Sequence, residues 1–506
     1  MMRAVQESSV QHLKVSPNFG QPPDYLFRPD IQSFRKAWFP QTYAIWEFFS
    51  ISFLVSALAF FFLFEWPVLV TLSGLIAFFY LGHMVFKLLV VQRSLAKPFL
   101  TFSKEEIVSL SDEELPLYTI LIPLYQEAEV VWQIRKAMEA IDYPKAKLEI
   151  LITLEQYDYA TQEAIARADF PSYFRILLLP DVPPKTKPKA LNVALLRAKG
   201  EFLVIYDAEI IPDPDQLKKA VLAFRKHPEI AFLQTRLDHY NTDQNILTKL
   251  FNIEFNFYYD LFLPGLQKFR FPLPLSGHST HFRRSAIEEV GGWDPYNVAE
   301  DCDIGIVLYR HGYRSEILDS VSKEEATTTL PAWMRQRSRW MKGFLQSSIV
   351  HLRHPLELKK DLGGWINFTA FLFIVPGTVL LNFLNLFYWL LLVGWFVTYS
   401  VFIQELFTGP ILPISVISSL GGNALFVYFN LIGSYRRGKY GLVKYALLSP
   451  FYWILLAVAS GKAVIQLFTK PYHWEKTAHG THLAQVKSQA ASKESSLGEM
   501  PIEFPA

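Results

Sequence analysis

The sequence predicts an α/β domain with a doubly wound, mostly parallel sheet, inserted between α-helical transmembrane segments. From about residue 117, short apolar runs alternate with amphipathic stretches, which is typical of parallel strands covered by helices on both faces. Apolar runs about long enough to cross a bilayer flank this region on both sides. We therefore expect a membrane protein with one folded domain outside the bilayer.

The net charge and the cysteine count of the chain argue against a nucleic-acid partner, a disulfide and a zinc site built from cysteines. The chain has 506 residues, of which 51% are hydrophobic and 15% aromatic, and its formal net charge is +2. Such a small net charge predicts no nucleic-acid partner. The single cysteine, Cys302, excludes an intramolecular disulfide and a zinc site built from cysteines.

The apolar runs predict six membrane spans, at residues 43–64, 67–91, 366–383, 385–403, 411–433 and 443–468. Basic residues precede the first run and end or follow the second: Arg35, Lys36, Lys87, Arg93 and Lys97. The positive-inside rule then places both outer ends of this hairpin, and with them the α/β domain, in the cytoplasm. We expect a multi-pass protein of the inner or plasma membrane.

Two arrangements fit the third and fourth runs. A hairpin turn at Asn382 and Asn385 gives six spans, but it places the basic loop at residues 434–441 outside. A single crossing by residues 366–403 returns that loop to the cytoplasm and moves the end of the chain out. We expect six spans because the segment after Pro471 has cytoplasmic character.

These boundaries divide the chain into five parts: a cytoplasmic N-terminal arm (1–42), a transmembrane hairpin (43–97), a cytoplasmic α/β domain that ends in an interfacial helix (98–360), a C-terminal transmembrane region (361–470) and a cytoplasmic segment with a disordered tail (471–506). Within the α/β domain, strands are expected at residues 117–125, 148–155, 174–180, 202–206 and 229–237. Helices are expected from Glu127, near 160–169, from Pro188 and near 213–226.

Asp207 and Glu209 follow the buried strand at residues 202–206. Ligands of open α/β sheets bind beyond the carboxyl ends of the strands. Mg²⁺ in such places takes one or two carboxylates together with substrate phosphates. The alternative is that Asp207 caps the next helix.

Three other groups of residues reach the same sheet edge. Tyr125 and Glu127 follow the first strand, where they either grip a nucleotide or end the strand and cap a helix. Glu155 ends the second strand. The third group is Lys185, Lys187 and Lys189, at the start of the helix from Pro188. Positive charges at a helix N-terminus are unfavourable for the helix dipole unless an anion binds there. These lysines therefore indicate either a phosphate site or a solvated loop.

Residues 276–284 form a Gly/Ser/His loop, in which we interpret His278 and His281 as polar lining of an acceptor pocket rather than as metal ligands. Glu300 and Asp301 then open a helix. Each is either an ordinary helix cap or a carboxylate that can act as a general base in a closed site.

Gln336, Arg339 and Trp340 lie at helical positions i, i+3 and i+4 and so share one face. An amide, a guanidinium and an indole on one face suit phosphate oxygens and a sugar ring. The alternative is an amphipathic helix at the membrane surface, and both interpretations are compatible.

Taken in order, these motifs resemble those of membrane-embedded processive glycosyltransferases of family 2, the group that contains cellulose, curdlan, chitin and hyaluronan synthases. The resemblance covers about residues 115–345 closely and the flanking spans in outline. Its motifs here are Pro123-x-Tyr125-x-Glu127, Glu155, Lys189 with Ala190-Leu191-Asn192, Asp207-Ala-Glu209, Ala299-Glu300-Asp301 and Gln336-Arg-Ser-Arg339-Trp340. The resemblance implies a GT-A-like fold.

The resemblance also implies a role for each motif. Tyr125, Glu127 and Glu155 would line the nucleotide pocket, with Lys189 near the base or diphosphate. Asp207 and Glu209 match the DxD motif, which holds Mg²⁺ or Mn²⁺ on the donor diphosphate. Asp301 matches the general base at the end of the TED motif, beside Glu300. Gln336, Arg339 and Trp340 match QxxRW, which binds the diphosphate and the acceptor. Trp474 and Thr477 lie in a segment similar to the gating loop of cellulose synthases.

Three positions depart from the family pattern. Glu209 replaces the second aspartate of DxD, Ala299 replaces the threonine of TED, and Glu155 stands where many relatives have Asp. All the essential carboxylates remain, while the details of nucleotide recognition are open.

The implied activity is inverting transfer of a hexose from a nucleotide sugar, UDP-glucose or UDP-N-acetylglucosamine, to a growing β-linked polysaccharide of the bacterial exopolysaccharide type, with passage of the chain across the membrane. Implied partners are the donor, a glycan acceptor, the bilayer, and export or regulatory proteins. The alternatives are a non-processive enzyme that glycosylates a lipid and a non-enzymatic transporter or receptor.

Overall fold

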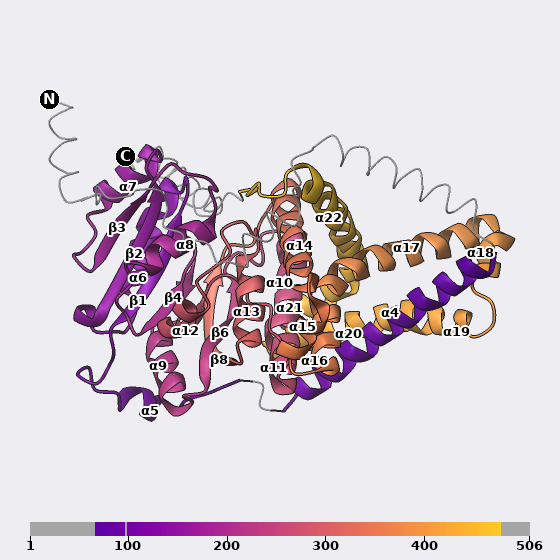
Figure 1. Cartoon of the computed structure of the whole chain (residues 1–506), viewed down its shortest axis with the longest axis horizontal. Coiled ribbons are helices and arrows are strands. Elements are labelled where there is room, and N and C mark those ends of the chain that lie inside the picture. Colours follow the sequence, from indigo (N-terminus) through magenta and orange to yellow (C-terminus); the bar gives the residue numbers. More distant parts are fainter. Residues whose placement is uncertain (1–65, 97–98, 477–506) are drawn as a thin grey trace, which may run out of the picture.

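The computed structural model describes residues 66–96 and 99–476. The N-terminal arm, the predicted span at 43–64 and Thr477 lie outside these residues. In Figure 1 the α/β domain forms the left part of the molecule, and long helices extend from it to the right.

The α/β domain is built on one eight-stranded sheet with the order β3-β2-β1-β4-β7-β6-β8-β5. The strands are β1 (Tyr118–Leu124), β2 (Leu148–Glu155), β3 (Phe174–Leu179), β4 (Phe202–Ile205), β5 (Ile211–Pro212), β6 (Ile230–His239), β7 (Thr280–Arg283) and β8 (Arg314–Glu324). β3, β2, β1 and β4 are parallel neighbours. The predicted α/β fold class and all five predicted strands are confirmed.

Alternate residues of the central strands enter two different cores. Ile120 and Ile150 pack on one face with α6 (Val131–Glu139) and α9 (Gln216–Lys226). Leu121 and Leu151 pack on the other face with α8 (Lys187–Leu195), α12 (Arg284–Glu289) and α13 (Glu300–Arg310). The period of two in the strands therefore places helices on both faces of the sheet.

The prediction of a loop over residues 276–284 is wrong in part. Thr280–Arg283 forms β7, which is antiparallel and pairs with β4 on one side and β6 on the other. His281 is fully buried, and its ring nitrogens lie 2.6 Å from the Tyr118 hydroxyl and 3.2 Å from Gln216 Oε1. His281 is therefore a core residue and does not line a pocket, because pairing on both sides overrides the weak strand signal of four mostly polar residues.

Four helical stretches among the described residues are long and apolar enough to cross a membrane: Trp66–Ser94, Pro376–Thr398, Ile411–Arg436 and Tyr440–Thr469. They correspond to α4 (Trp66–Ser94), α17 (Pro376–Thr398), α19 (Ile411–Val416) continued by α20 (Gly422–Arg436), and α21 (Tyr440–Val443) continued by α22 (Ser449–Thr469). α15 (Pro355–Asp361), α16 (Trp365–Ile374) and α18 (Val401–Leu406) are shorter.

The predicted hairpin turn at Asn382 and Asn385 is wrong. Both residues lie inside α17, which begins at Pro376, a residue that readily starts a helix. Asn382 Nδ2 donates to Ser460 Oγ at 3.0 Å, and Asn385 Oδ1 accepts from the Tyr80 hydroxyl at 2.8 Å. In an apolar helix bundle, these amides are satisfied by neighbouring helices and need no turn.

The basic loop after α20 lies against the α/β domain. Arg437 forms two hydrogen bonds with Asp260, at 2.8 and 2.6 Å, and Lys439 forms an ion pair with Asp238. The six-span arrangement places this loop on the opposite side of the membrane from the α/β domain, whereas these contacts place it beside the domain.

The two ends of α22 are both tied to the domain side of the molecule. Beyond its C-terminal end, Pro471 O accepts from Gln346 Nε2 at 3.0 Å, on α14 (Leu330–Leu352). Near its start, the Tyr452 hydroxyl accepts from Trp333 Nε1 of the same helix at 3.0 Å. Figure 1 shows α22 beside α14, whereas α4, α17, α19 and α20 extend away from the domain.

Candidate active site

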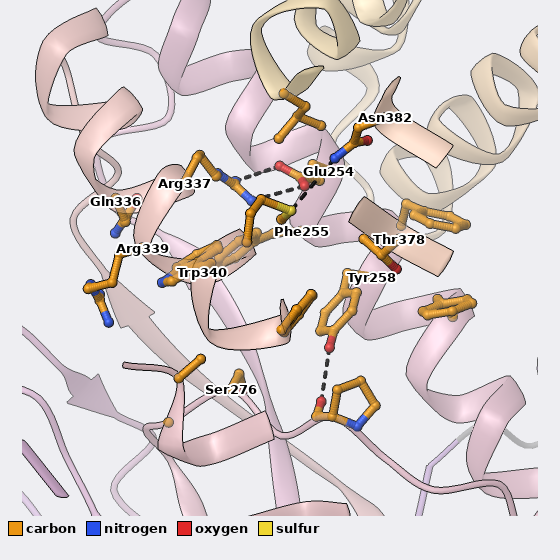
Figure 2. A pocket seen from close by; sticks show the side chains of 18 of the residues that line it. Glu254, Phe255, Tyr258, Ser276, Gln336, Arg337, Arg339, Trp340, Thr378 and Asn382 are labelled. Atoms are coloured by element: carbon orange, nitrogen blue, oxygen red, sulfur yellow. Dashed lines mark hydrogen bonds and ion pairs between the residues drawn. The ribbon is translucent and has the colours of Figure 1, made fainter. Parts of the chain in front are cut away.

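A cavity of about 280 Å³ lies where the sheet edge, α14 and the long helices meet (Figure 2). It is lined by residues of the β4 end, the β7 and α13 approaches, α14, and the segment after α22. Among the residues predicted for the site, the ones that line it are Asp207, Glu209, His278, Glu300, Asp301, Gln336, Arg339, Trp340 and Trp474.

Asp207 and Glu209 follow the end of β4 at Ile205. Asp207 Oδ1 lies 2.6 Å from Lys187 Nζ, and Glu209 is buried with its backbone carbonyl accepting from Gln133 Nε2 at 3.0 Å. Within the described residues, no three His, Cys, Asp or Glu side chains are placed to hold a metal ion. Two carboxylates nevertheless fit a divalent ion that takes its other ligands from substrate phosphates and water.

Lys187 is a site residue that the sequence pattern did not distinguish from Lys185 and Lys189. It opens α8, and its ammonium also donates to Gly277 O at 2.8 Å and lies 3.7 Å from Glu300 Oε1. Burial would lower the pKa of Lys187, but Asp207 and Glu300 outweigh it and raise the pKa. A charged lysine at a helix N-terminus, among carboxylates, is suited to an incoming phosphate. The lysines at this helix start were the signal, but their spacing did not single out Lys187.

Asp301 lies in the first turn of α13, and its Oδ1 accepts from the backbone N–H of Cys302 at 2.7 Å. A Cβ at Gly277, whose φ is +68°, would lie 2.5 Å from Asp301 Oδ2. Only glycine therefore allows the loop to approach this carboxylate. Burial raises the pKa of Asp301, although Lys187 and Arg339 oppose the shift.

Glu300 precedes Asp301 and is buried against the same cations. Burial raises the pKa of Glu300 to about 7, with Lys187 opposing and Asp301 adding to the shift. Two adjacent carboxylates with raised pKa values suit proton transfer near neutral pH.

The turn before Asp301 is fixed by α14. Val298 N donates to Gln346 Oε1 at 2.9 Å, and Asn297 Nδ2 donates to Ser347 Oγ at 2.9 Å. A Cβ at Gly343 would lie 2.2 Å from the Cβ of Ala299, so the two backbones touch at this point. The small residue in place of the family threonine thus packs against α14. These contacts from α14 were not predicted from the sequence.

Gln336 and Arg339 face the cavity from α14 with unused polar atoms (Figure 2). Gln336 Oε1 and Arg339 Nε are buried and have no hydrogen-bond partner among the described residues. Arg339 Nη1 donates weakly to Val298 O at 3.3 Å, and burial lowers the pKa of Arg339 although acids of the site oppose the shift. Buried polar atoms without partners are costly, which indicates that a ligand completes them.

Trp340 and Trp474 supply flat rings. Trp340 stacks on Phe255, with ring centroids 6.4 Å apart, and the Arg337 guanidinium lies 4.4 Å from its ring. Trp474 lies under the Arg339 guanidinium at 4.4 Å. The segment that carries Trp474 is tied to α22 by Glu475, whose Oε1 lies 2.8 Å from Lys462 Nζ.

Four residues predicted to bind the nucleotide are not part of the cavity lining: Tyr125, Glu127 and Glu155 at the ends of β1 and β2, and Lys189 in α8. Glu155 Oε1 lies 3.0 Å from Lys189 Nζ, which also donates to Val182 O at 3.0 Å. Tyr125 N donates to Glu127 Oε2 at 3.4 Å, and the Tyr125 carbonyl accepts from Lys476. Lys189 is thus paired with Glu155, and Lys187 is the lysine that meets Asp207.

The opposite end of the cavity lies between the long helices. Arg337 forms a two-point ion pair with Glu254 of α10 (Ile246–Phe257), at 3.0 and 2.5 Å (Figure 2). The Tyr452 hydroxyl also donates to Glu254 Oε2, at 2.7 Å. Thr378 and Asn382 line the cavity from α17. Sequence reasoning missed this end, although Glu254 stands out as a charge in an apolar helix.

Residues 202–458 match glycosyl transferase family group 2, a match that covers just over half of the chain. A probable glycosyltransferase of Bacillus subtilis, YdaM, is 27% identical over 72% of this chain and 87% of its own length. Probable glucomannan 4-beta-mannosyltransferase 1 of Arabidopsis thaliana is 24% identical over 66% of this chain and 62% of its own length, so the match spans less than two thirds of that relative.

Among solved structures, the mannosyltransferase PcManGT from Pyrobaculum calidifontis, in complex with GDP-Man and Mn²⁺, aligns with a TM-score of 0.49 and 19% identity, over 79% of this chain and 99% of that chain. S. aureus TarS 1-349 in complex with UDP-GlcNAc aligns with a TM-score of 0.36 and 14% identity, over 66% of this chain and 91% of that chain. The family match, which extends from β4 through Asp301 and the Gln336–Trp340 face into the apolar helices, shows that the chain belongs to glycosyl transferase family group 2 and is a glycosyltransferase.

Proposed function

We propose that the protein transfers a hexose from a nucleotide sugar to a growing β-linked polysaccharide, which then passes between the long helices. The observation that carries this proposal is that one cavity joins the catalytic carboxylates to polar side chains of the membrane helices. Family membership already makes the protein an enzyme, so the non-enzymatic transporter or receptor is set aside.

In the proposed reaction, Asp301 takes the proton of an acceptor hydroxyl as the oxygen attacks the anomeric carbon. The bond from that carbon to the diphosphate breaks, and the nucleoside diphosphate leaves with the electron pair. Lys187 and Arg339 offset the negative charge that develops on the leaving diphosphate. Attack without a covalent intermediate inverts the anomeric centre.

The donor diphosphate would bind at the β4 end. Asp207 and Glu209 would hold Mg²⁺ or Mn²⁺, which when bound supplies positive charge to the diphosphate. Lys187 would move from Asp207 to the phosphates when this ion arrives, because a divalent ion neutralises the carboxylate that now pairs with it. Tyr125, Glu127, Glu155 and Lys189 would position the nucleoside at the ends of β1 and β2.

The acceptor would lie along Trp340, with Gln336 and Glu300 beside it, and the Trp474 segment would close over the donor, with Thr477 following. Beyond Trp340, the cavity is lined by the neutral polar side chains of Thr378, Asn382, Asn385 and Asn430. Amides and hydroxyls form hydrogen bonds with sugar hydroxyls that can break and re-form one after another. Such a lining suits a neutral glycan that moves along the cavity.

A lipid glycosyltransferase is the second candidate, because Lys87 of α4 also lines the membrane end of the cavity. Its ammonium lies 4.7 Å from the Phe426 ring, and no ion pair is recorded for it among the described residues. A lipid-linked phosphate would pair with this charge, whereas a neutral polysaccharide would not.

We also infer four membrane crossings: the predicted one at residues 43–64, then α4, α17 and α19–α20. α22 would lie along α14 on the cytoplasmic side. This arrangement places the basic loop Arg436–Lys439 in the cytoplasm, as the positive-inside rule requires. Cysteines introduced at Gly409 and Gly438 test it: with a membrane-impermeant thiol reagent on intact cells, Gly409→Cys should react and Gly438→Cys should not.

The test of function uses purified full-length protein with Mg²⁺ or Mn²⁺ and a panel of UDP-sugars. GDP-mannose is tested as well, because the relative from Arabidopsis thaliana is a probable mannosyltransferase. Nucleotide release together with a high-molecular-weight, glycosidase-sensitive product supports the proposal. Release with only a short, lipid-extractable product favours the lipid enzyme. If the Asp301→Asn variant releases nucleotide as fast as the wild type, Asp301 is not the base.

A further inference from the structure

A second hollow, of about 800 Å³, lies at the junction of the α/β domain and the apolar helices. Its walls are the turn after β6 (residues 239–244), Lys249 of α10, and residues 439–445 around α21. None of these residues lines the catalytic cavity. We call this hollow the basic groove.

Two lysines of the basic groove converge on one ring. Lys249 Nζ lies 4.9 Å, and Lys444 Nζ 5.2 Å, from the centroid of Tyr445. The partner of Lys249 is Asp243 at 3.7 Å, whose side chain is 93% exposed, so solvent screens this pair. Lys444 is exposed, and no ion pair is recorded for it in the described part of the chain. Lys439, by contrast, is neutralised by Asp238.

Apolar side chains continue from the same groove along the start of α22. Tyr440 is 64% exposed, Leu447 63% and Phe451 66%. Tyr440 packs edge-on against Tyr435 at the end of α20, a stretch long and apolar enough to cross a membrane. Exposed aromatic and aliphatic groups beside lysines are the pattern of a surface at the level of lipid head groups.

We propose that the basic groove binds the phosphate head group of an anionic phospholipid, with Lys249 and Lys444 as its charged partners. Ammonium groups pair with phosphate oxygens in charge-assisted hydrogen bonds. The acyl chains then cover Leu447, just before α22, and Phe451 in its first turn, which explains why these apolar side chains are exposed. Basic pockets between membrane helices suit anionic head groups. This site is independent of the proposed polysaccharide activity.

The test measures lipid retained by the full-length protein in a non-ionic detergent, by native mass spectrometry after addition of phosphatidylglycerol or phosphatidylcholine. Wild type should retain phosphatidylglycerol preferentially. The double variant Lys249→Gln/Lys444→Gln should lose roughly tenfold or more in apparent affinity, because each lysine near the phosphate contributes to binding. Lys136→Gln/Lys199→Gln removes the same charge at exposed positions of the α/β domain and should leave retention unchanged.

Three results would overturn the proposal. They are equal retention of the two lipids, unchanged retention in the groove variant, and complete displacement of phosphatidylglycerol by inorganic phosphate at equal concentration, which would identify a free-anion site. The single variant Lys444→Gln is a control for misfolding of the double variant, because the Lys444 side chain is exposed and its replacement should not disturb the fold. This single variant should still weaken retention, and Lys249→Arg/Lys444→Arg should restore it.

Discussion

At the sheet edge the catalytic cavity is lined by charges: Asp207, Glu300 and Asp301 surround the ammonium of Lys187. Between the helices it is lined mainly by amides, hydroxyls and aromatic rings, and there Arg337 is matched by Glu254. Bond breaking needs charge where a diphosphate leaves, whereas a sliding acceptor needs contacts that re-form easily. In the function we propose, the two ends of the cavity therefore divide chemistry from transport, and each can be disturbed without the other.

The largest effect is expected at the base. Asp301→Asn keeps the shape of the side chain but cannot accept the proton, so the transfer rate should fall by about 10²- to 10⁴-fold while donor affinity changes little. Rates come from nucleotide release and donor affinity from calorimetry. Asp303→Asn, in the same helix turn but bound to His351 at 3.0 Å, serves as a control for helix stability. An equal loss in both variants would contradict a specific role for Asp301.

Lys187→Met tests the cation at the same end. It removes the charge that faces Asp207 and the departing diphosphate, so the rate should fall by roughly 10²-fold. Lys189→Met is the matched control: it breaks the pair with Glu155 and should act on donor affinity more than on the rate. If Lys189→Met proves the more damaging to the rate, the two lysines have been assigned the wrong way round.

The raised pKa values of the carboxylates predict the pH profile. A base with a raised pKa becomes protonated at higher pH than an ordinary carboxyl, so transfer should begin to decline at a higher pH than it would with an unperturbed aspartate as base. Lys187→Met removes a cation that opposes this shift, so the pKa of Asp301 rises further and the acid limb shifts to higher pH. Profiles normalised to each enzyme's maximum show the shift, and an unmoved limb would contradict the coupling.

The α/β domain was more predictable than the helical part, for physical reasons. The strands from β1 to β4 could be read from sequence because each is a buried apolar run bounded by polar turns. Strand β7 could not, since Thr280–Arg283 becomes a strand only by pairing on both sides. The predicted hairpin turn failed at Asn382 and Asn385, where partners on other helices satisfy amides that suggest a turn in sequence. Lys187 and Lys189 are equivalent in sequence, and only folding decides which meets Asp207.

The smallest effect on rate is expected at the membrane end. Asn382 lines the cavity and donates to Ser460 Oγ, and Asn382→Leu removes an amide from the proposed path without touching the carboxylates. The rate of nucleotide release should change by about twofold or less, because the group lost makes no contact with the leaving diphosphate. Product length, measured by gel filtration, should shorten because the acceptor leaves more often between transfers. Asn382→Gln keeps an amide and should restore most of the length. If Asn382→Leu lowers the rate and leaves product length intact, the polar lining belongs to the chemistry, and the division between the two ends is wrong.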